Sequence, residues 1–182
     1  MSASIRRIEL GHPSDAVVAE LVGELSEPQR VESLSWMTTL ERQRFESEVV
    51  GRGERFLSGR WLLRMLVAEL LRCEPSDVLI SSACLDCGGE HGAPLALAHG
   101  QKVWVSLSHA ADAHIAAVSL TYRVGVDVEL PREGIDVEEW ARREAMAKVD
   151  GIGLREPARE LGDLTVKGFT TSGLVGALAW VP

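Results

Sequence analysis

Two carboxylates in an alternating segment are the first candidates for chemistry. Asp127 and Glu129 lie in the run Val124-Gly-Val-Asp-Val-Glu-Leu130. A strand with this alternation turns its even positions, Val124, Val126, Val128 and Leu130, toward a core and places both carboxylates on the opposite face. Neighbouring carboxylates repel each other unless water or a cation lies between them, and Mg²⁺ prefers oxygen ligands. By itself the pattern is more typical of a solvated strand face than of a metal site.

A helix expected over residues 138–149 carries the next candidates. Trp140, Glu144 and Lys148 follow one another at intervals of four, so they share one helix face, and Arg143 lies beside Glu144. One interpretation is a surface ion pair between Glu144 and Lys148, which would stabilise the helix by only about 0.3–0.5 kcal/mol. The other is a third carboxylate beside a lysine that binds phosphate. This helix alone does not separate the two interpretations.

A single histidine ends another expected strand. His109 follows Ser106-Leu-Ser108 and precedes two alanines. A lone histidine is more often structural than catalytic, but this one falls in an expected loop, where binding residues concentrate. His109 therefore stays a candidate binding residue.

The cysteines allow a metal knuckle without requiring one. Cys84, Cys87 and His91 supply three ligands, and a structural zinc needs about four, so Cys73 would have to complete the set. The more frequent alternative is a glycine-rich turn that carries two thiols. An odd and small number of cysteines fits a reducing compartment better than a disulfide framework.

Length and charge limit the class of protein. The chain has 182 residues and a net charge of -8, which suits one compact domain or two small halves. No apolar run approaches the roughly 20 residues that span a bilayer, and the first residues lack a signal-peptide pattern. We therefore expect a cytoplasmic protein. The acidic balance argues weakly against nucleic acid as a partner.

Hydrophobic periodicity predicts an α+β fold, with strands and helices segregated. The apolar spacing over 54–71 is the strongest helix signal. Further helices are expected over 14–25, 38–50 and 138–149. Strands are expected over 5–10, 78–82, 94–98, 103–109, 114–120, 124–130, 164–166 and 174–181.

Four segments, taken in order, resemble the pattern of one family. They are Gly92-Ala-Pro94, Val105-Ser-Leu-Ser-His109-Ala110, Val124-Gly-Val-Asp-Val-Glu129 and Trp140-Ala-Arg-Arg-Glu-Ala-Met-Ala-Lys148. The surfactin-type 4′-phosphopantetheinyl transferases have G-K-P, S-H-S, V-G-[VI]-D-[VI]-E and W-[ST]-x-K-E-[AS]-x-x-K, of which the last two are specific. The family's N-terminal half is resembled by the segment Phe56-Leu-Ser-Gly-Arg60-Trp-Leu-Leu-Arg64. Its actinobacterial members are resembled by the segment Cys84-Leu-Asp-Cys87-Gly-Gly-Glu-His91-Gly92.

The resemblance implies a fold of two α/β halves related by a pseudo-twofold axis, residues 1–102 and 103–182, with coenzyme A bound between them. Such an enzyme transfers 4′-phosphopantetheine from coenzyme A to a serine of an apo acyl or peptidyl carrier protein and releases 3′,5′-ADP. It serves fatty acid or natural product biosynthesis. The expected partners are coenzyme A and a carrier protein, with no nucleic acid and no membrane. Two halves in one chain favour a monomer.

The resemblance also implies residue roles. Asp127, Glu129 and Glu144 would hold Mg²⁺, and Glu144 would be the base for the carrier serine. Lys148 would bind the pyrophosphate and protonate the leaving group. The implied coenzyme A contacts are Arg55 on the 3′-phosphate, His109 on a phosphate, and Arg60, Gly92, Pro94, Ser108 and Lys148. His109 also counts among the catalytic residues. Arg60 and Arg64 fall in the corresponding helix, but they match the family less closely than Arg55 does. A dication and an ammonium are what the charge developing at a phosphoryl group requires.

The sequence departs from the family pattern in three places. Ala93 replaces the lysine of G-K-P, and Arg143 replaces the lysine before the helix glutamate, a change that keeps the charge but need not keep the geometry. Glu144 follows Glu129 by only 15 positions, where most relatives have a much longer segment near the carrier-protein site. A short loop can still join a strand to the next helix, so the carrier-docking surface is what this departure affects.

Two other functions remain open at this point. One is a coenzyme A or carrier-protein binding module without transferase activity, which Ala93 and the short connection motivate. The retained Asp127, Glu129, Glu144 and Lys148 argue against it, because a binder needs no metal set. The other is an unrelated Mg²⁺-dependent phosphohydrolase. Such an enzyme would need a geometry that activates water.

Overall fold

Two antiparallel sheets and four α-helices make up the described part of the chain, so the predicted α+β class is confirmed. The structure is a computed structural model and describes residues 2–10, 16–49, 51–83, 92–150 and 163–182. The helices are α1 (Glu27–Ser35), α2 (Thr39–Ser47), α3 (Arg52–Leu71) and α4 (Val137–Asp150), and a 3₁₀ turn, η1, covers Pro75–Asp77. Among the described residues, no helix is both long enough and apolar enough to cross a membrane.

The larger sheet has six strands in the order β1-β2-β6-β5-β4-β3. Their bounds are β1 Ser4–Arg7, β2 Val17–Val22, β6 Ala113–Ser119, β5 Gln101–Ala110, β4 Leu95–Ala98 and β3 Leu79–Ser81. The smaller sheet has the order β7-β9-β8, with β7 Arg123–Glu129, β9 Leu174–Val181 and β8 Thr165–Thr171. The expected boundary between residues 102 and 103 falls inside β5, whose neighbours β4 and β6 lie on opposite sides of that boundary in the sequence.

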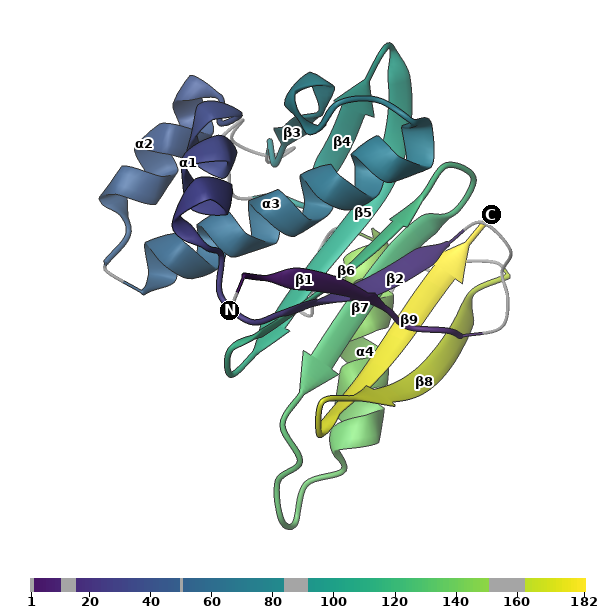
Figure 1. Ribbon diagram of the computed structural model, residues 1–182. Helices are drawn as coiled ribbons and strands as arrows, with labels where there is room; N and C mark the ends of the chain where they lie inside the picture. The colour runs from purple at the N-terminus through teal and green to yellow at the C-terminus, as the bar shows by residue number, and fades with distance from the viewer. Residues whose placement is uncertain (1, 11–15, 50, 84–91, 151–162) are drawn as a thin grey trace.

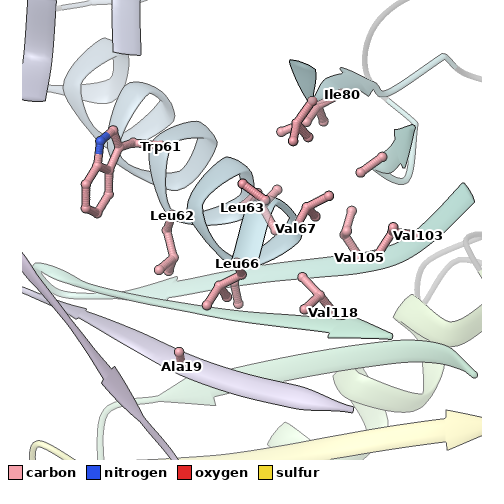
Figure 2. Close-up of a cluster of buried hydrophobic side chains, with 14 of the residues drawn as sticks. Ala19, Trp61, Leu62, Leu63, Leu66, Val67, Ile80, Val103, Val105 and Val118 are labelled. Atoms are coloured by element: carbon pink, nitrogen blue, oxygen red, sulfur yellow. The ribbon is translucent and has the colours of Figure 1, made fainter. Parts of the chain in front are cut away.

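The elements stack in four layers (Figure 1). Helix α3 covers one face of the six-stranded sheet, and Figure 2 shows Leu62 and Leu66 pointing from the helix toward the strands. The other face of that sheet packs on the three-stranded sheet, and α4 covers the outer face of the smaller sheet. Apolar burial of about 25 cal/mol per Å² drives this stacking, because each sheet face and helix stripe needs a partner.

The alternation of β7 places its side chains as the sequence predicts, except at the end. Val124, Val126 and Val128 belong to the core between the two sheets, and the odd positions turn toward α4. Leu130 was expected to face that core, but it lies one residue past the end of β7 and is 44% exposed. The prediction for Leu130 is therefore wrong, because the strand's pairing with β9 stops at Glu129.

The helix predicted over 14–25 is wrong. The described part of that segment contains β2, which pairs with β1 on one side and with β6 on the other. Apolar and β-branched residues such as Val17 and Val18 suit both periodicities, and the pairing with two strands decides between them. Residues 18–21 are all buried, which is typical of a strand inside a sheet and not of a one-sided helix.

A helix that the periodicity does not predict precedes α2. Helix α1 begins after Ser26, whose backbone N–H donates to the Gln29 side chain at 2.9 Å, and Pro28 lies in its first turn. This Ser-x-x-Gln capping pattern was the available signal.

The strand predicted over 164–166 is longer than expected, since β8 continues to Thr171 along β9.

Candidate functional site

A glycine lets α4 lie directly on β7. A Cβ at Gly125 would stand 2.0 Å from the Ala145 carbonyl oxygen and 2.8 Å from the Val149 backbone nitrogen. Only a residue without a side chain permits this approach of helix backbone to strand. Gly125 therefore sets the distance between the strand that carries Asp127 and the helix that carries Glu144 and Lys148.

Lys148 and Asp127 form the central contact of the site. The lysine Nζ donates to Asp127 Oδ1 at 2.6 Å and to the Val126 carbonyl oxygen at 3.0 Å. Asp127 is only 4% exposed, whereas about 29% of the Lys148 side chain is accessible. A buried carboxylate needs such a partner, because its desolvation is otherwise costly. The ammonium is thus held at a fixed position on the surface of the site.

Two buried serines connect β5 to the outer edge of β7. The Ser106 hydroxyl accepts a hydrogen bond from the Val126 N–H at 3.0 Å, and the Ser108 hydroxyl accepts one from the Val128 N–H at 3.3 Å. Ser108 also donates to Asp127 Oδ1 at 2.8 Å. The two hydroxyls satisfy backbone donors that a sheet edge would otherwise leave unpaired. Ser108, expected to contact coenzyme A, is buried here against Asp127.

The three predicted metal ligands lie in one neighbourhood. Burial and the negative charges of Asp127 and Glu129 raise the pKa of the Glu144 carboxyl, and Lys148 only partly opposes them. Glu129, at the end of β7, is half-buried and pairs with Arg132 at 3.3 Å. Within the described ranges, Asp127 Oδ2 is buried with no hydrogen-bond partner. These side chains supply hard oxygen donors of the kind that Mg²⁺ takes, and one of those oxygens has no partner.

The carboxylates are not drawn together into a closed metal cage. No group of three histidine, cysteine, aspartate or glutamate side chains in the described residues is arranged to hold a metal ion. Lys148 instead takes one oxygen of Asp127. Glu129 and Glu144 would have to turn toward Asp127 for all three to share an ion.

Arg55, from the expected N-terminal half, and His109, from β5, lie close to the Asp127–Lys148 pair. His109 lies near the end of β5, and Arg55 lies in the first turn of α3, with both side chains exposed. Desolvation lowers the pKa of the His109 imidazole, the charges of Arg55 and Lys148 lower it further, and Asp127 alone raises it. The electrostatic coupling shows that His109 is a neighbour of both Arg55 and the Asp127–Lys148 pair.

Arg60, expected to contact coenzyme A, lies inside the protein. It is 5% exposed, donates to the Ser82 hydroxyl at 2.7 Å and lies 3.3 Å from a carboxylate oxygen of Glu41. Arg64 is fully buried and pairs with the same Glu41 at 2.6 Å. A glutamate of α2 thus joins two arginines of α3, and this network fixes one helix against the other.

The Gly92-Ala-Pro94 segment starts beside this network. The Gly92 N–H donates to the Ser82 carbonyl oxygen at 2.6 Å, and Pro94 is half-buried immediately before β4. Cys84, Cys87 and His91, the candidate zinc ligands, lie outside the described residues. Cys73 is half-buried, and burial, followed by the charge of Asp77, raises the pKa of its thiol.

Trp140 completes the predicted helix face. It is 45% exposed on α4, one turn before Glu144, so an apolar surface lies beside the carboxylates.

Sequence reasoning missed two residues, Ser106 and His114. His114 is the register partner of His109 across the β5–β6 hairpin. A turn placed at Ala111 would pair the strand residues on either side of it, and this pairing was the signal that could have identified His114.

Comparison with known proteins identifies no family for this chain. No protein-family model matches the sequence, and no match to a curated protein was found.

Proposed function

We propose that the chain is a Mg²⁺-dependent 4′-phosphopantetheinyl transferase that acts on coenzyme A and an apo acyl or peptidyl carrier protein. The observation that carries this proposal is the Asp127–Lys148 pair with Glu129 and Glu144 beside it. These residues come from β7 and α4, the two segments with the most specific motif resemblance. The family's two-half fold, a monomeric state and a cytoplasmic location belong to the same proposal, and α3 and α4 each covering one sheet supports the two halves.

The reaction breaks the pyrophosphate of coenzyme A and forms a phosphodiester with a serine hydroxyl of the carrier. Lys148 presents an ammonium to the pyrophosphate oxygens and can give a proton to the leaving 3′,5′-ADP. Glu144 takes the serine proton, directly or through water. The raised pKa of its carboxyl suits this role, because a general base must bind the proton that it removes.

Asp127, Glu129 and Glu144 would together hold the metal ion. When bound, a dication neutralises charge on the phosphoryl oxygens. Asp127 Oδ2, which has no partner in the described part of the chain, is the atom best placed to accept such a cation. Ser108 and Lys148 fix the other oxygen of Asp127 and so orient the carboxylate.

His109 and Arg55 would bind the phosphates of coenzyme A at the junction of the two halves. Arg60, Gly92 and Ser108 would act from behind this surface, since each holds a neighbouring element in place. Pro94 would fix the start of β4 beside the substrate. Trp140 and the exposed loop before α4 would face the carrier protein.

The test incubates the protein with coenzyme A, Mg²⁺ and several apo carrier proteins and weighs the carriers by mass spectrometry. The expected result is a mass gain of one phosphopantetheine group, absent with Asp127→Asn. Asp77→Asn is the matched control, because Asp77 pairs with His99 away from the site. Absence of a mass gain on every carrier would contradict the proposal.

A second function is favoured by a specific observation. Lys148 forms an ion pair with Asp127, and the carboxylates of the described residues form no closed metal group. Both features suit a coenzyme A or carrier-protein binding module. Thermal unfolding separates the two functions. If coenzyme A raises the unfolding temperature but no carrier gains mass, the binding module is the better description.

A further inference from the structure

A second histidine lies behind His109 and has no part in the proposed reaction. His114 on β6 is the cross-strand partner of His109, and the two rings stack with centroids 6.1 Å apart and an interplanar angle of 25°. His109 is exposed, whereas His114 is only 6% exposed. The buried His114 ring therefore packs against one face of the exposed His109 ring.

His114 also contacts the start of α3. Its Nε2 lies 3.1 Å from the Arg55 carbonyl oxygen. A carbonyl oxygen only accepts hydrogen bonds, so Nε2 carries the hydrogen and donates it. This bond ties the first turn of α3 to the β5–β6 hairpin, two elements far apart in the sequence. The backbone of Arg55 and the ring of His109 thus share one support.

The charges around His114 favour its neutral form. Burial lowers the pKa of the imidazole, and the positive charges of His109 and Arg55 lower it as well, while the carbonyl groups of Arg55 and Asp112 raise it. A neutral, buried ring is poorly suited to binding an anion itself. It is well suited to holding the exposed side chains of His109 and Arg55 in place.

We propose that His114 is a positioning residue that makes Arg55 and His109 a single anion-binding corner. The inference rests on the proposed function, because coenzyme A supplies the phosphates that this corner would bind. The hydrogen bond fixes the main chain from which the Arg55 side chain projects, and the ring stack fixes His109. Asp127, Glu144 and Lys148, which act on the reacting atoms, do not depend on either contact.

Two substitutions separate the contacts of His114. His114→Phe keeps an aromatic ring beside His109 but removes the donor to Arg55, and His114→Gln keeps an amide donor but removes the ring. His99→Gln is the control, because His99 is an exposed histidine that pairs with Asp77 away from the hairpin. The KM for coenzyme A, kcat, the unfolding temperature and the dissociation constant for inorganic pyrophosphate are measured for each variant.

For His114→Phe we expect the KM for coenzyme A and the pyrophosphate dissociation constant to rise about five- to tenfold, with kcat within about twofold of the starting value. His114→Gln should also weaken both constants, because it keeps the donor to Arg55 but removes the ring beside His109, and His99→Gln should change neither constant. A purely structural role gives another pattern: both His114 variants lower the unfolding temperature and kcat together, and KM stays unchanged. That pattern, or unchanged constants in His114→Phe, would overturn the inference.

Failure of the proposed function can be distinguished from failure of this inference. If the unsubstituted protein transfers nothing to any carrier, the transferase proposal fails. The dissociation constants for pyrophosphate then test the role of His114 by themselves. Weaker pyrophosphate binding in both His114→Phe and His114→Gln, but not in His99→Gln, still supports the positioning role. Equal affinities in all variants, or no measurable binding by the unsubstituted protein, refutes it.

Discussion

Two serines on β5 differ in a single contact. Ser106 and Ser108 each accept a hydrogen bond from an outer N–H of β7, but only Ser108 also donates to Asp127. Their positions two apart on one strand place both hydroxyls on the same side. At the scale of the residue, the support of the strand and the orientation of the carboxylate can therefore be separated by experiment.

Replacing either serine with alanine should lower the free energy of unfolding by about 1–3 kcal/mol, because each change leaves a buried N–H of β7 without its acceptor. Only Ser108→Ala should also strongly lower the proposed transferase activity, since Asp127 loses a hydrogen bond. Urea denaturation and the carrier mass assay measure the two effects. Equal activity in both variants would show that Ser108 does not orient Asp127.

Glu41 forms ion pairs with two buried arginines. It pairs with Arg60 and Arg64, and its carboxylate also accepts a hydrogen bond from the Thr38 N–H at 3.0 Å at the start of α2. Removing one member of a buried ion pair leaves an uncompensated buried charge. This residue thus links the cap of one helix to the inner face of the next.

Glu41→Gln should lower the free energy of unfolding by about 3–5 kcal/mol. Glu54→Gln is the matched control, because Glu54 pairs with Arg30 on the surface, and such exposed pairs contribute about 0–1 kcal/mol. Chemical denaturation of both variants measures the difference. Similar losses in the two variants would mean that burial does not govern the Glu41 network.

At the scale of the element, the contact between α4 and β7 determines whether a site exists. Gly125 allows the helix backbone to touch the strand, and Ala141 and Ala145 keep that helix face small. Small residues at a close contact are what such an approach requires. Lys148 reaches Asp127 only because the two elements are this close.

Gly125→Ala should displace α4, because the new Cβ would meet backbone atoms that cannot move aside. We expect a loss of about 1–3 kcal/mol or more in the free energy of unfolding, together with loss of activity. Gly168→Ala on β8 is the control, since its Cβ would meet only ordinary contacts at 3.7 Å and beyond. Thermal unfolding of both variants checks this, and equal unfolding temperatures would contradict the close contact.

At the scale of the whole molecule, a buried carboxylate joins the two sheets. Glu20 on β2 accepts hydrogen bonds from Arg6 of β1 and from Thr171 of β8, the latter at 2.7 Å. Burial raises the pKa of Glu20, but the hydrogen bonds from Ser172, Arg6 and Thr171 outweigh it, so the net shift is downward. The ionised carboxylate therefore stabilises the contact between the larger sheet and the β8–β9 turn.

This shift predicts a pH dependence of stability. Because the pKa is lower in the folded state, the contribution of Glu20 is fully present above the ordinary pKa of an unfolded glutamate and is lost as the pH falls through the folded pKa. Unfolding free energies measured from neutral to acid pH should show a smaller decline in Glu20→Gln than in the unsubstituted protein. Parallel curves for the two proteins would refute the role of Glu20.

Elements whose hydrophobic periodicity fits a single conformation could be predicted from the sequence. Over residues 54–71 the apolar spacing allows only a helix, and over 174–181 β9 has the predicted bounds. The alternation around Asp127 also placed its carboxylate on the face opposite the valines. Local spacing suffices in these segments, because side-chain direction follows from backbone geometry alone.

The remaining features depend on contacts between distant segments. Residues 17–22 are a strand because β1 and β6 pair with them, and no local signal reports β6, which lies more than 90 residues further along the chain. The burial of Arg60 against Glu41, the Ser108 hydroxyl on Asp127 and the His114 ring behind His109 are likewise contacts between distant segments. Spacing along the chain predicted which candidate side chains share a face, but packing between layers determined which groups hold them.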